Sequence, residues 1–494
     1  MFTEKKSLTL SSIELPVFLK ESLLFLKSGL SSLKAFLWPI SRSESFKCIS
    51  LILIHILVTF NYTILKSLKD PVVITLKNSG GAMFLPYLKT WAVLPAAIFA
   101  ALLFTKFCHR FGFRKTFNIF LSFFIIYFAL FVFVLFPYRE SFFIGSPSFT
   151  DIDSGSYGFF SFLIPLFKRL LVIIHFWPLT SFYVVSELWS SIALSVLFWG
   201  FANQVTQFGE AKRFYGLINL FGNLSGVVAA AFAIYLNEYS RGVFCDRSCA
   251  WNYTIYRLGL VLTVFCCLIF LLFNVAYKKY SLSKKPSEQI LRKKKKIGIF
   301  ESFSKASESK YVLCIALIVL AYNLSMNILE IVWKDQALLL YPKESEIHWF
   351  NSKILLWTGI FSTFVSLFIS SFIRAFGWSK TAYATPVLLS FLSALFFYFF
   401  FFGSNHEQFL LLLNPAFTPL FVLVMIGSLQ NVLCRSFKFS FFDATKEMSF
   451  IPLSKEQKIN AKAVIDGFGS RFGKAGGALM TQVLDPILHT ITAM

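Results

Sequence analysis

Apolar runs of about twenty residues recur along this chain, and they constrain its fold more than any other feature. The stretch 116–136, for example, contains no charged residue. A bilayer offers no water to backbone amides and carbonyls, so such runs cross it as helices. The chain of 494 residues is 56% hydrophobic and only 15% charged, which is less charge than soluble proteins carry. We therefore predict an all-α, polytopic membrane protein.

The positions of the runs predict about eleven crossings. The run 170–207 is too long for one perpendicular helix, and Pro178 breaks it, which predicts a lead-in helix followed by one crossing. A polar, charged link is expected at 434–458, before the last crossing. The predicted crossings are 46–65, 90–108, 116–136, 180–204, 211–236, 255–277, 311–332, 350–373, 381–402, 409–433 and about 461–484.

Basic loops alternate with acidic or near-neutral loops, apart from the basic excursion 66–89. The basic set includes the N-terminus, the turns HRFGFRK (109–115) and RAFGWSK (374–380), and a strongly basic divider at 278–296. The positive-inside rule therefore places these loops and the N-terminus in the cytoplasm. The loops also account for the net charge of +22. Because no soluble basic domain is present, no nucleic-acid partner is expected.

The two halves of the chain resemble each other weakly. FGNLSG (221–226) recurs as FGKAGG (472–477), and Asn61 has a counterpart in Asn323. Such self-similarity is typical of two parallel six-helix repeats with a substrate site where they meet. The predicted parts are a cytoplasmic N-terminal segment with an amphipathic surface helix (1–45), an N-terminal six-helix half (46–277), a basic cytoplasmic linker (278–309) and a C-terminal half with five crossings (310–494).

Charged residues deep in the crossings are the candidate substrate-binding residues, because an ionisable group in a bilayer is costly. Lys89 could alternatively snorkel to the interface, and Glu330 could form a local pair with Lys334. Glu187 has apolar neighbours on both sides, and Lys474 lies among glycines that let backbones approach closely. Two Lys and two Glu, one pair in each half, suit an anionic ligand. The lysines can bind phosphate, while the carboxylates bind a base or ribose, or balance the lysines when the site is empty.

No enzyme motif accompanies these residues: the sequence has no P-loop, no G-x-S-x-G, no H-E-x-x-H and no repeated acidic metal cluster. We therefore predict neither catalysis nor a cofactor nor a metal. Cys245 and Cys249 share a polar loop and could pair if that loop faces an oxidising space. His55 and His175 are candidate proton sites, although a lone His on an apolar helix more often hydrogen-bonds within the bundle.

Several long stretches resemble one family. They are NYTILKSLKD (61–70), LPYLKTW (85–91), SELWSSIALSVLFWGFANQ (186–204), EAKRFY (210–215), NILEIVWK (327–334), SLQNVLCRSFKFSFFDATKEMSFIPL (428–453) and KAVIDGFGSRFGKAGGAL (462–479). Together they resemble the ATP/ADP translocases, the nucleotide transporters of plastids and obligate intracellular bacteria. The resemblance implies a twelve-helix fold similar to the major facilitator superfamily and alternating-access exchange of ATP for ADP plus phosphate. It also implies that the essential charged residues are Lys89, Glu187, Glu330 and Lys474.

Departures from the family pattern keep a second function open. The sequence KSLKD (66–70) stands where the family usually has Arg-Asp-Thr-Lys-Asp, and Met83 stands where an acidic residue is usual. Proton-coupled import of a broader set of nucleotides is therefore the alternative. A polytopic enzyme of lipid metabolism is disfavoured, because the sequence has no polar dyad near one face. A twelfth crossing is missing after 484, which predicts an outside C-terminus and a less stable protein.

The predicted partners are ATP, ADP and other nucleotides as substrates, together with the lipid bilayer. The predicted location is the inner membrane of a bacterium. Further polar residues are candidates for a supporting role at the site: Asn203, Gln204, Asn323, Asp443 and Lys446.

Overall fold

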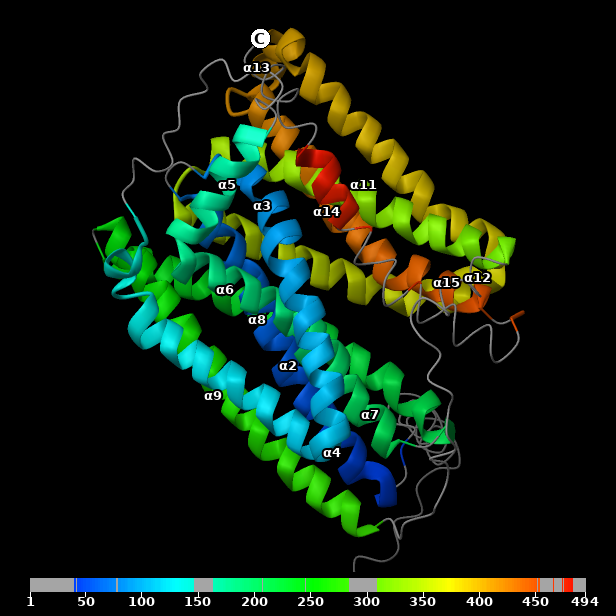
Figure 1. Ribbon diagram of the computed structural model, residues 1–494. Helices are drawn as coiled ribbons and strands as arrows, with labels where there is room; N and C mark the ends of the chain where they lie inside the picture. The colour runs from blue at the N-terminus through cyan, green and yellow to red at the C-terminus, as the bar shows by residue number, and fades with distance from the viewer. Residues whose placement is uncertain are drawn as a thin grey trace, which may run out of the picture.

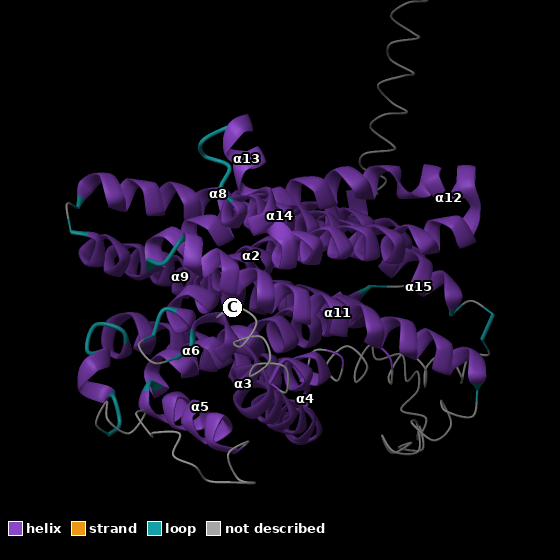
Figure 2. Ribbon diagram, turned by 90° about the horizontal axis from the view of Figure 1, so that it is seen from above, coloured by secondary structure: helices purple, strands orange, loops and turns teal. Residues whose placement is uncertain are grey.

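The computed structural model contains only helices, turns and loops in the part of the chain that it describes (Figure 2). The described residues are 40, 42–76, 79–145, 163–206, 208–244, 246–283, 309–450, 452–453, 465, 473 and 475–482. The predicted N-terminal surface helix, most of the basic linker and most of the last crossing lie outside these residues. Cys245 also lies outside them, so its pairing with Cys249 stays a prediction.

Within the described residues, nine helices are long and apolar enough to cross a membrane, which confirms the polytopic all-α class. One of them, Gly81–Leu135, is 55 residues long and turns back at Gly112, so it crosses twice. The helical elements are α2 (Arg42–Ile74), η1 (Gly81–Met83), α3 (Phe84–Tyr87), η2 (Leu88–Val93), α4 (Leu94–Leu130), η3 (Phe131–Leu135), η4 (Arg139–Phe142), α5 (Leu163–His175), α6 (Trp177–Leu188), η7 (Trp189–Phe198), α7 (Trp199–Val205), α8 (Phe208–Val243), α9 (Arg247–Ser283), α11 (Lys310–Leu340), α12 (Glu344–Phe402), η8 (Gly403–His406), α13 (Glu407–Leu413), α14 (Pro419–Phe437), η9 (Lys438–Phe442) and α15 (Asp443–Ser449).

Two basic turns in corresponding halves of the chain have nearly the same backbone geometry. Gly112 in HRFGFRK has φ 75° and ψ 165°, and Gly377 in RAFGWSK has φ 78° and ψ 168°. Glycine adopts this conformation readily because it has no Cβ. Each glycine therefore divides one long helical element, α4 or α12, into two crossings joined by a tight turn.

The crossing within 170–207 forms as predicted. The lead-in helix α5 ends at His175, and Phe176 leaves helical geometry with φ −92° and ψ 33°. Pro178 lies in the first turn of α6, where its missing amide hydrogen is not needed. The elements α6, η7 and α7 then form a single crossing, Trp177–Val205.

The tenth crossing differs from the prediction of 409–433 followed by a polar link at 434–458. The helix α14 begins at Pro419 and is capped by Thr418, whose Oγ1 accepts a hydrogen bond from the Phe421 amide at 3.2 Å. It continues through η9 and α15, so the crossing is Pro419–Ser449. The predicted link was wrong up to residue 449, because its polar side chains include several that face an internal cavity rather than lipid.

The helices form two groups (Figure 1). The N-terminal group comprises α2 to α9, and the C-terminal group comprises α11 to α15. They meet where α12 packs against α8 and α2. Gly359 of α12 allows this close approach, because a Cβ there would lie 2.7 Å from Cγ2 of Val227 in α8. At the same contact, His348 of α12 lies 3.3 Å from the Ser67 hydroxyl and 2.9 Å from the Asn237 amide nitrogen. From there the groups diverge toward α7 and α15 (Figure 1).

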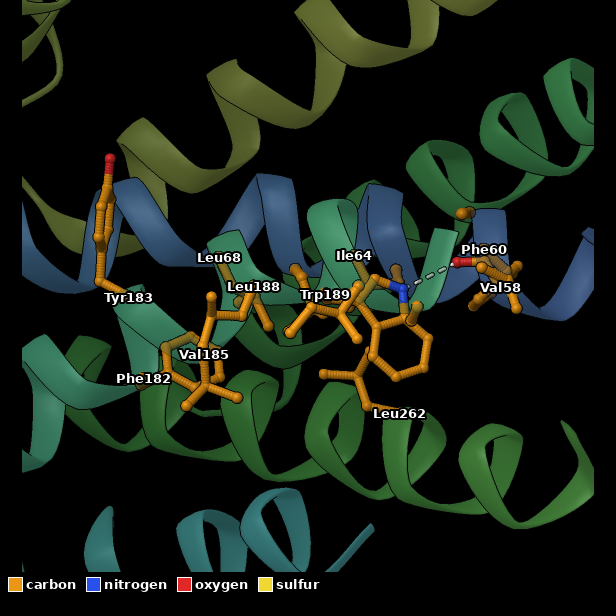
Figure 3. Close-up of a cluster of buried hydrophobic side chains, with 14 of the residues drawn as sticks. Val58, Phe60, Ile64, Leu68, Phe182, Tyr183, Val185, Leu188, Trp189 and Leu262 are labelled. Carbon is orange, nitrogen blue, oxygen red and sulfur yellow. Dashed lines mark hydrogen bonds between the residues drawn. The ribbon is translucent and has the colours of Figure 1, made fainter. Parts of the chain in front are cut away.

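Trp189 anchors the crossing that carries Glu187 against α2. Its side chain is fully buried, and its indole Nε1 donates to the carbonyl of Val58 at 3.1 Å (Figure 3). The surrounding apolar side chains include Ile64 and Leu68 of α2 (Figure 3). Because this core fixes both helices, the opposite face of the α6 crossing can present a charged residue in a fixed place.

Candidate functional site

A cavity of about 880 Å³ lies between the two helix groups, and both groups contribute to its lining. Its volume is within the range of small-molecule and cofactor sites. The charged residues of the lining are Lys66, Lys69, Lys89, Glu187, Glu330, Arg435, Lys438, Asp443, Lys446 and Glu447. Six are cations and four are acids, so the lining carries a net positive charge that suits an anionic ligand.

Three of the four predicted binding residues line this cavity. Lys89 is in the π-helical segment η2, and its Nζ donates to Oδ1 of Asn327 in α11 at 2.7 Å. It therefore reaches across to the other helix group. Glu187 comes from α6 and Glu330 from α11, one from each group. The structure thus brings together residues that are far apart in the sequence.

Lys474 lies outside the described residues, but several of its neighbours are described. A Cβ at Gly473 would lie 2.9 Å from Cβ of Asn323, and one at Gly477 would lie 3.1 Å from Cβ of Asn327. Ala475 lines the cavity. The small residues around Lys474 therefore allow close packing against α11, as their composition predicts.

Six buried or half-buried charges form a continuous network beside the cavity. On the N-terminal side, the Lys69 ammonium lies 2.7 Å from Glu187 and 3.0 Å from Asp70. Asp70 of α2 then lies 2.6 Å from Lys334 of α11, which joins the two helix groups. Lys334 also contacts Glu330 of its own helix, so the network extends into the C-terminal group.

On the C-terminal side, Glu330 lies 2.5 Å from Lys334 and 2.7 Å from Arg435. The local i, i+4 pair therefore forms, and Glu330 also lines the cavity. The network contains three cations and three carboxylates, so it is neutral as a whole. Breaking a buried pair by removing one partner costs about 3–5 kcal/mol, because it leaves an uncompensated charge. The network is therefore a strong restraint on the relative position of the two groups.

π-helical segments carry much of the cavity lining. Lys89 is in η2, Ser190 and Ser195 are in η7, and Lys438 and Phe439 are in η9. A π-turn widens the helix, re-aims its side chains and occurs frequently at functional sites. Neither hydropathy nor helical periodicity revealed these segments.

The predicted supporting residues divide into two sets. Asn323, Asp443 and Lys446 line the cavity. Asn203 and Gln204 do not line it; they are exposed on α7, where Asn203 accepts a hydrogen bond from the Tyr215 hydroxyl at 2.5 Å.

The candidate proton sites lie elsewhere. His55 is buried against Phe198 and does not line the cavity. His175 also lies outside the lining, and its Nδ1 is 2.7 Å from the Ile144 carbonyl. This contact is of the kind that a lone histidine makes within a helix bundle.

Seven charged residues of the site or its network are not among the residues predicted from the sequence: Lys66, Lys69, Asp70, Lys334, Arg435, Lys438 and Glu447. The sequence places Lys69 only in a motif and Lys66 only in a departure from the family pattern, and it offers Lys334 only as a local partner of Glu330. Arg435 was missed because it was assigned to a loop. The pattern of a charged residue within an apolar run would have found Lys69 and Lys334, but apart from the local Glu330–Lys334 pair nothing in the sequence specifies their partners.

Comparison with known proteins finds a protein family whose model matches most of this chain. A family model described as TLC ATP/ADP transporter matches residues 26–494. ADP,ATP carrier protein 1 of Chlamydia muridarum (strain MoPn / Nigg) is 36% identical over 476 residues, covering 94% of this chain and 86% of the relative. ADP,ATP carrier protein 1 of Rickettsia prowazekii (strain Madrid E) is 34% identical over 472 residues, covering 94% of this chain and 91% of the relative.

The solved structures support the fold. The crystal structure of the nucleoside transporter NupG matches with a TM-score of 0.50 at 12% identity, covering 88% of this chain and 91% of that one. At this identity the likeness concerns the fold alone. It agrees with the predicted fold class, an all-α bundle similar to the major facilitator superfamily.

Proposed function

Because the chain belongs to the TLC ATP/ADP transporter family, we propose that it exchanges ATP for ADP across a membrane by alternating access. It is a multi-pass membrane transporter and not an enzyme. The observation that carries the proposal is the net-positive cavity between two helix groups, each of which supplies charged residues to it. Nucleotides are polyanions, and cations in an apolar bundle are the groups that would bind their phosphates.

The charge network suggests how substrate binding and reorientation are coupled. Glu187 holds Lys69, and Glu330 holds Arg435. A nucleotide phosphate competes for these cations and weakens the same network that contains the pair between the helix groups. Reorientation of the loaded carrier then costs less than that of the empty one. Obligatory exchange requires this difference, because an empty carrier that reoriented freely would catalyse net uptake.

The positive-inside rule gives the orientation. With the N-terminus in the cytoplasm of a bacterial cell, the C-terminal ends of α2 and α11 lie at the outer face of its inner membrane. The Asp70–Lys334 pair lies near these ends, and the cavity lining extends to Trp199 and Lys446 near the opposite ends of the crossings. With this orientation, the pair supports a carrier that is closed on the outside and has its cavity directed to the inside.

Exchange in proteoliposomes tests the proposal. Purified protein is reconstituted, the vesicles are loaded with ADP or left empty, and uptake of labelled ATP is measured with and without an uncoupler. We expect uptake that needs internal ADP and tolerates the uncoupler. Uptake into empty vesicles that needs a proton gradient would instead establish the alternative, proton-coupled import. A panel of unlabelled nucleotides in the same assay defines whether other nucleotides are substrates.

Variants of the predicted binding residues connect transport to the cavity. Lys89→Gln and Lys474→Gln should each raise the KM for ATP roughly ten- to a hundred-fold, since a charged hydrogen bond contributes about 1.5–3 kcal/mol. Lys106→Gln is the matched control, because Lys106 is exposed on α4 and does not line the cavity. Normal ATP uptake by the Lys474→Gln protein would remove Lys474 from the site but would leave the fold unaffected.

A further inference from the structure

The cations that line the cavity differ in how they are neutralised. Lys69 is held by two carboxylates, and Arg435 by one. Lys66 and Lys89 line the same cavity, yet neither forms an ion pair with a described carboxylate. Since the neighbouring network is neutral as a whole, these two lysines add uncompensated positive charge to the lining.

The described contact of the Lys66 ammonium is with an uncharged aromatic ring, that of Tyr62. Lys66 is half-buried in α2, and its Nζ lies 5.7 Å from the centre of the Tyr62 ring, one helical turn earlier. Tyr62 also lines the cavity. A cation over an aromatic ring is partly stabilised but keeps its charge available to a ligand. Lys89 is similarly held by a neutral acceptor, the Asn327 amide oxygen.

An uncompensated ammonium within a membrane bundle is costly, and it is retained where it binds something. Glu330 and Arg435, which belong to the other helix group, line the same cavity as Lys66. A ligand bound at Lys66 would therefore lie where the two groups face each other. Such a ligand must be anionic, since it has to balance the positive charge of Lys66.

We propose that Lys66 binds the phosphate chain of the transported nucleotide and that, together with Lys89, it makes the carrier select substrates by their number of phosphates. The proposal rests on the proposed function and names a selectivity residue for it. Two uncompensated lysines match a di- or triphosphate better than a monophosphate, and they leave a neutral nucleoside without a charged partner. Lys66 acts here by contact with the substrate and not through another residue.

Equilibrium binding to the purified full-length protein tests this without requiring transport. The affinities of ATP, ADP, AMP and adenosine are measured for the parent protein and for Lys66→Met, Lys66→Arg and Lys106→Met. We expect Lys66→Met to weaken ATP and ADP binding roughly ten- to a hundred-fold, AMP binding less and adenosine binding by less than about two-fold. Lys66→Arg, which keeps the charge, should restore most of the loss, and Lys106→Met should resemble the parent.

Each contrary result has a separate meaning. If the parent protein binds none of these nucleotides, the proposed function fails and the role of Lys66 fails with it. If the parent binds ATP but Lys66→Met weakens all four ligands equally, or if Lys66→Arg fails to restore ATP binding, Lys66 has a structural role and the inference is overturned. Should Lys66→Met fail to fold, as judged by size-exclusion chromatography, the comparison of Lys66→Arg with Lys66→Gln decides in the same way. Competition of inorganic triphosphate with ATP is measured for the parent protein and for Lys66→Met. This comparison separates recognition of the phosphate chain from recognition of the whole nucleotide.

Discussion

The Asp70–Lys334 pair should keep the outer end of the cavity closed, and neutralising either residue should open it. Both side chains are buried, with 5% and 6% of their surface exposed, and their charged atoms are 2.6 Å apart. Asp70→Asn leaves Lys69 and Lys334 facing each other and gives the neutral network one excess positive charge. Lys334→Gln gives it one excess negative charge. The double variant is neutral again, although it lacks the pair.

The structure sets the size of the effect. One charged hydrogen bond between the groups contributes about 1.5–3 kcal/mol. Its loss should shift the equilibrium between outward-closed and outward-open states by roughly ten- to 150-fold. The second partners, Glu187 for Lys69 and Glu330 for Lys334, remain and limit the cost to the fold. In a double-mutant cycle the two changes should couple by about 1–3 kcal/mol, because they share one contact.

Thiol labelling measures this opening. In a background whose eight native cysteines are replaced, Ser190→Cys places one thiol in the cavity. A membrane-impermeant reagent added from outside should label it at least ten times faster in the Asp70→Asn protein than in the parent. Glu210→Gln is the matched control, because its partner Lys47 is 2.7 Å away within the same helix group. Unchanged labelling in both the Asp70→Asn and Lys334→Gln proteins would refute the pair as an outer closure.

Two further predictions concern the cavity and the packing of its walls. Glu187→Gln and Glu330→Gln should each lower the maximal rate of exchange more than the affinity for ATP, because the carboxylates balance the cations of the carrier when no nucleotide is bound. Initial-rate kinetics over a range of ATP concentrations separate the two effects. An affinity loss equal to the rate loss would contradict this role. Gly427→Ala should destabilise the protein by about 1–3 kcal/mol, because its Cβ would collide with the Trp333 indole, whereas Gly216→Ala has open space and should leave the melting temperature in detergent within a degree or so.

The sequence alone determined the membrane character, the approximate positions of the crossings and the tight basic turns. These are local properties: an apolar run of sufficient length crosses a bilayer whatever surrounds it, and a glycine in a short basic stretch permits a reversal. The cost of charge in lipid likewise identified Lys89, Glu187 and Glu330 before their surroundings were known. The error at 434–449 shows the limit of this reasoning, since a polar helix that faces a cavity has the same composition as a loop.

Only the tertiary structure decided which charges that are distant in the sequence neutralise each other. Asp70 pairs with Lys334 across 264 positions of sequence, and Arg435 pairs with Glu330 of another helix. Pairing also distinguishes Lys66 from Lys69, which are the same residue type in the same helix: two carboxylates hold Lys69, whereas no described carboxylate forms an ion pair with Lys66. Composition and periodicity report how a residue partitions between water and lipid. They carry no information on the few ångströms that separate one ammonium from one carboxylate, and that separation depends on how helices distant in the chain pack together.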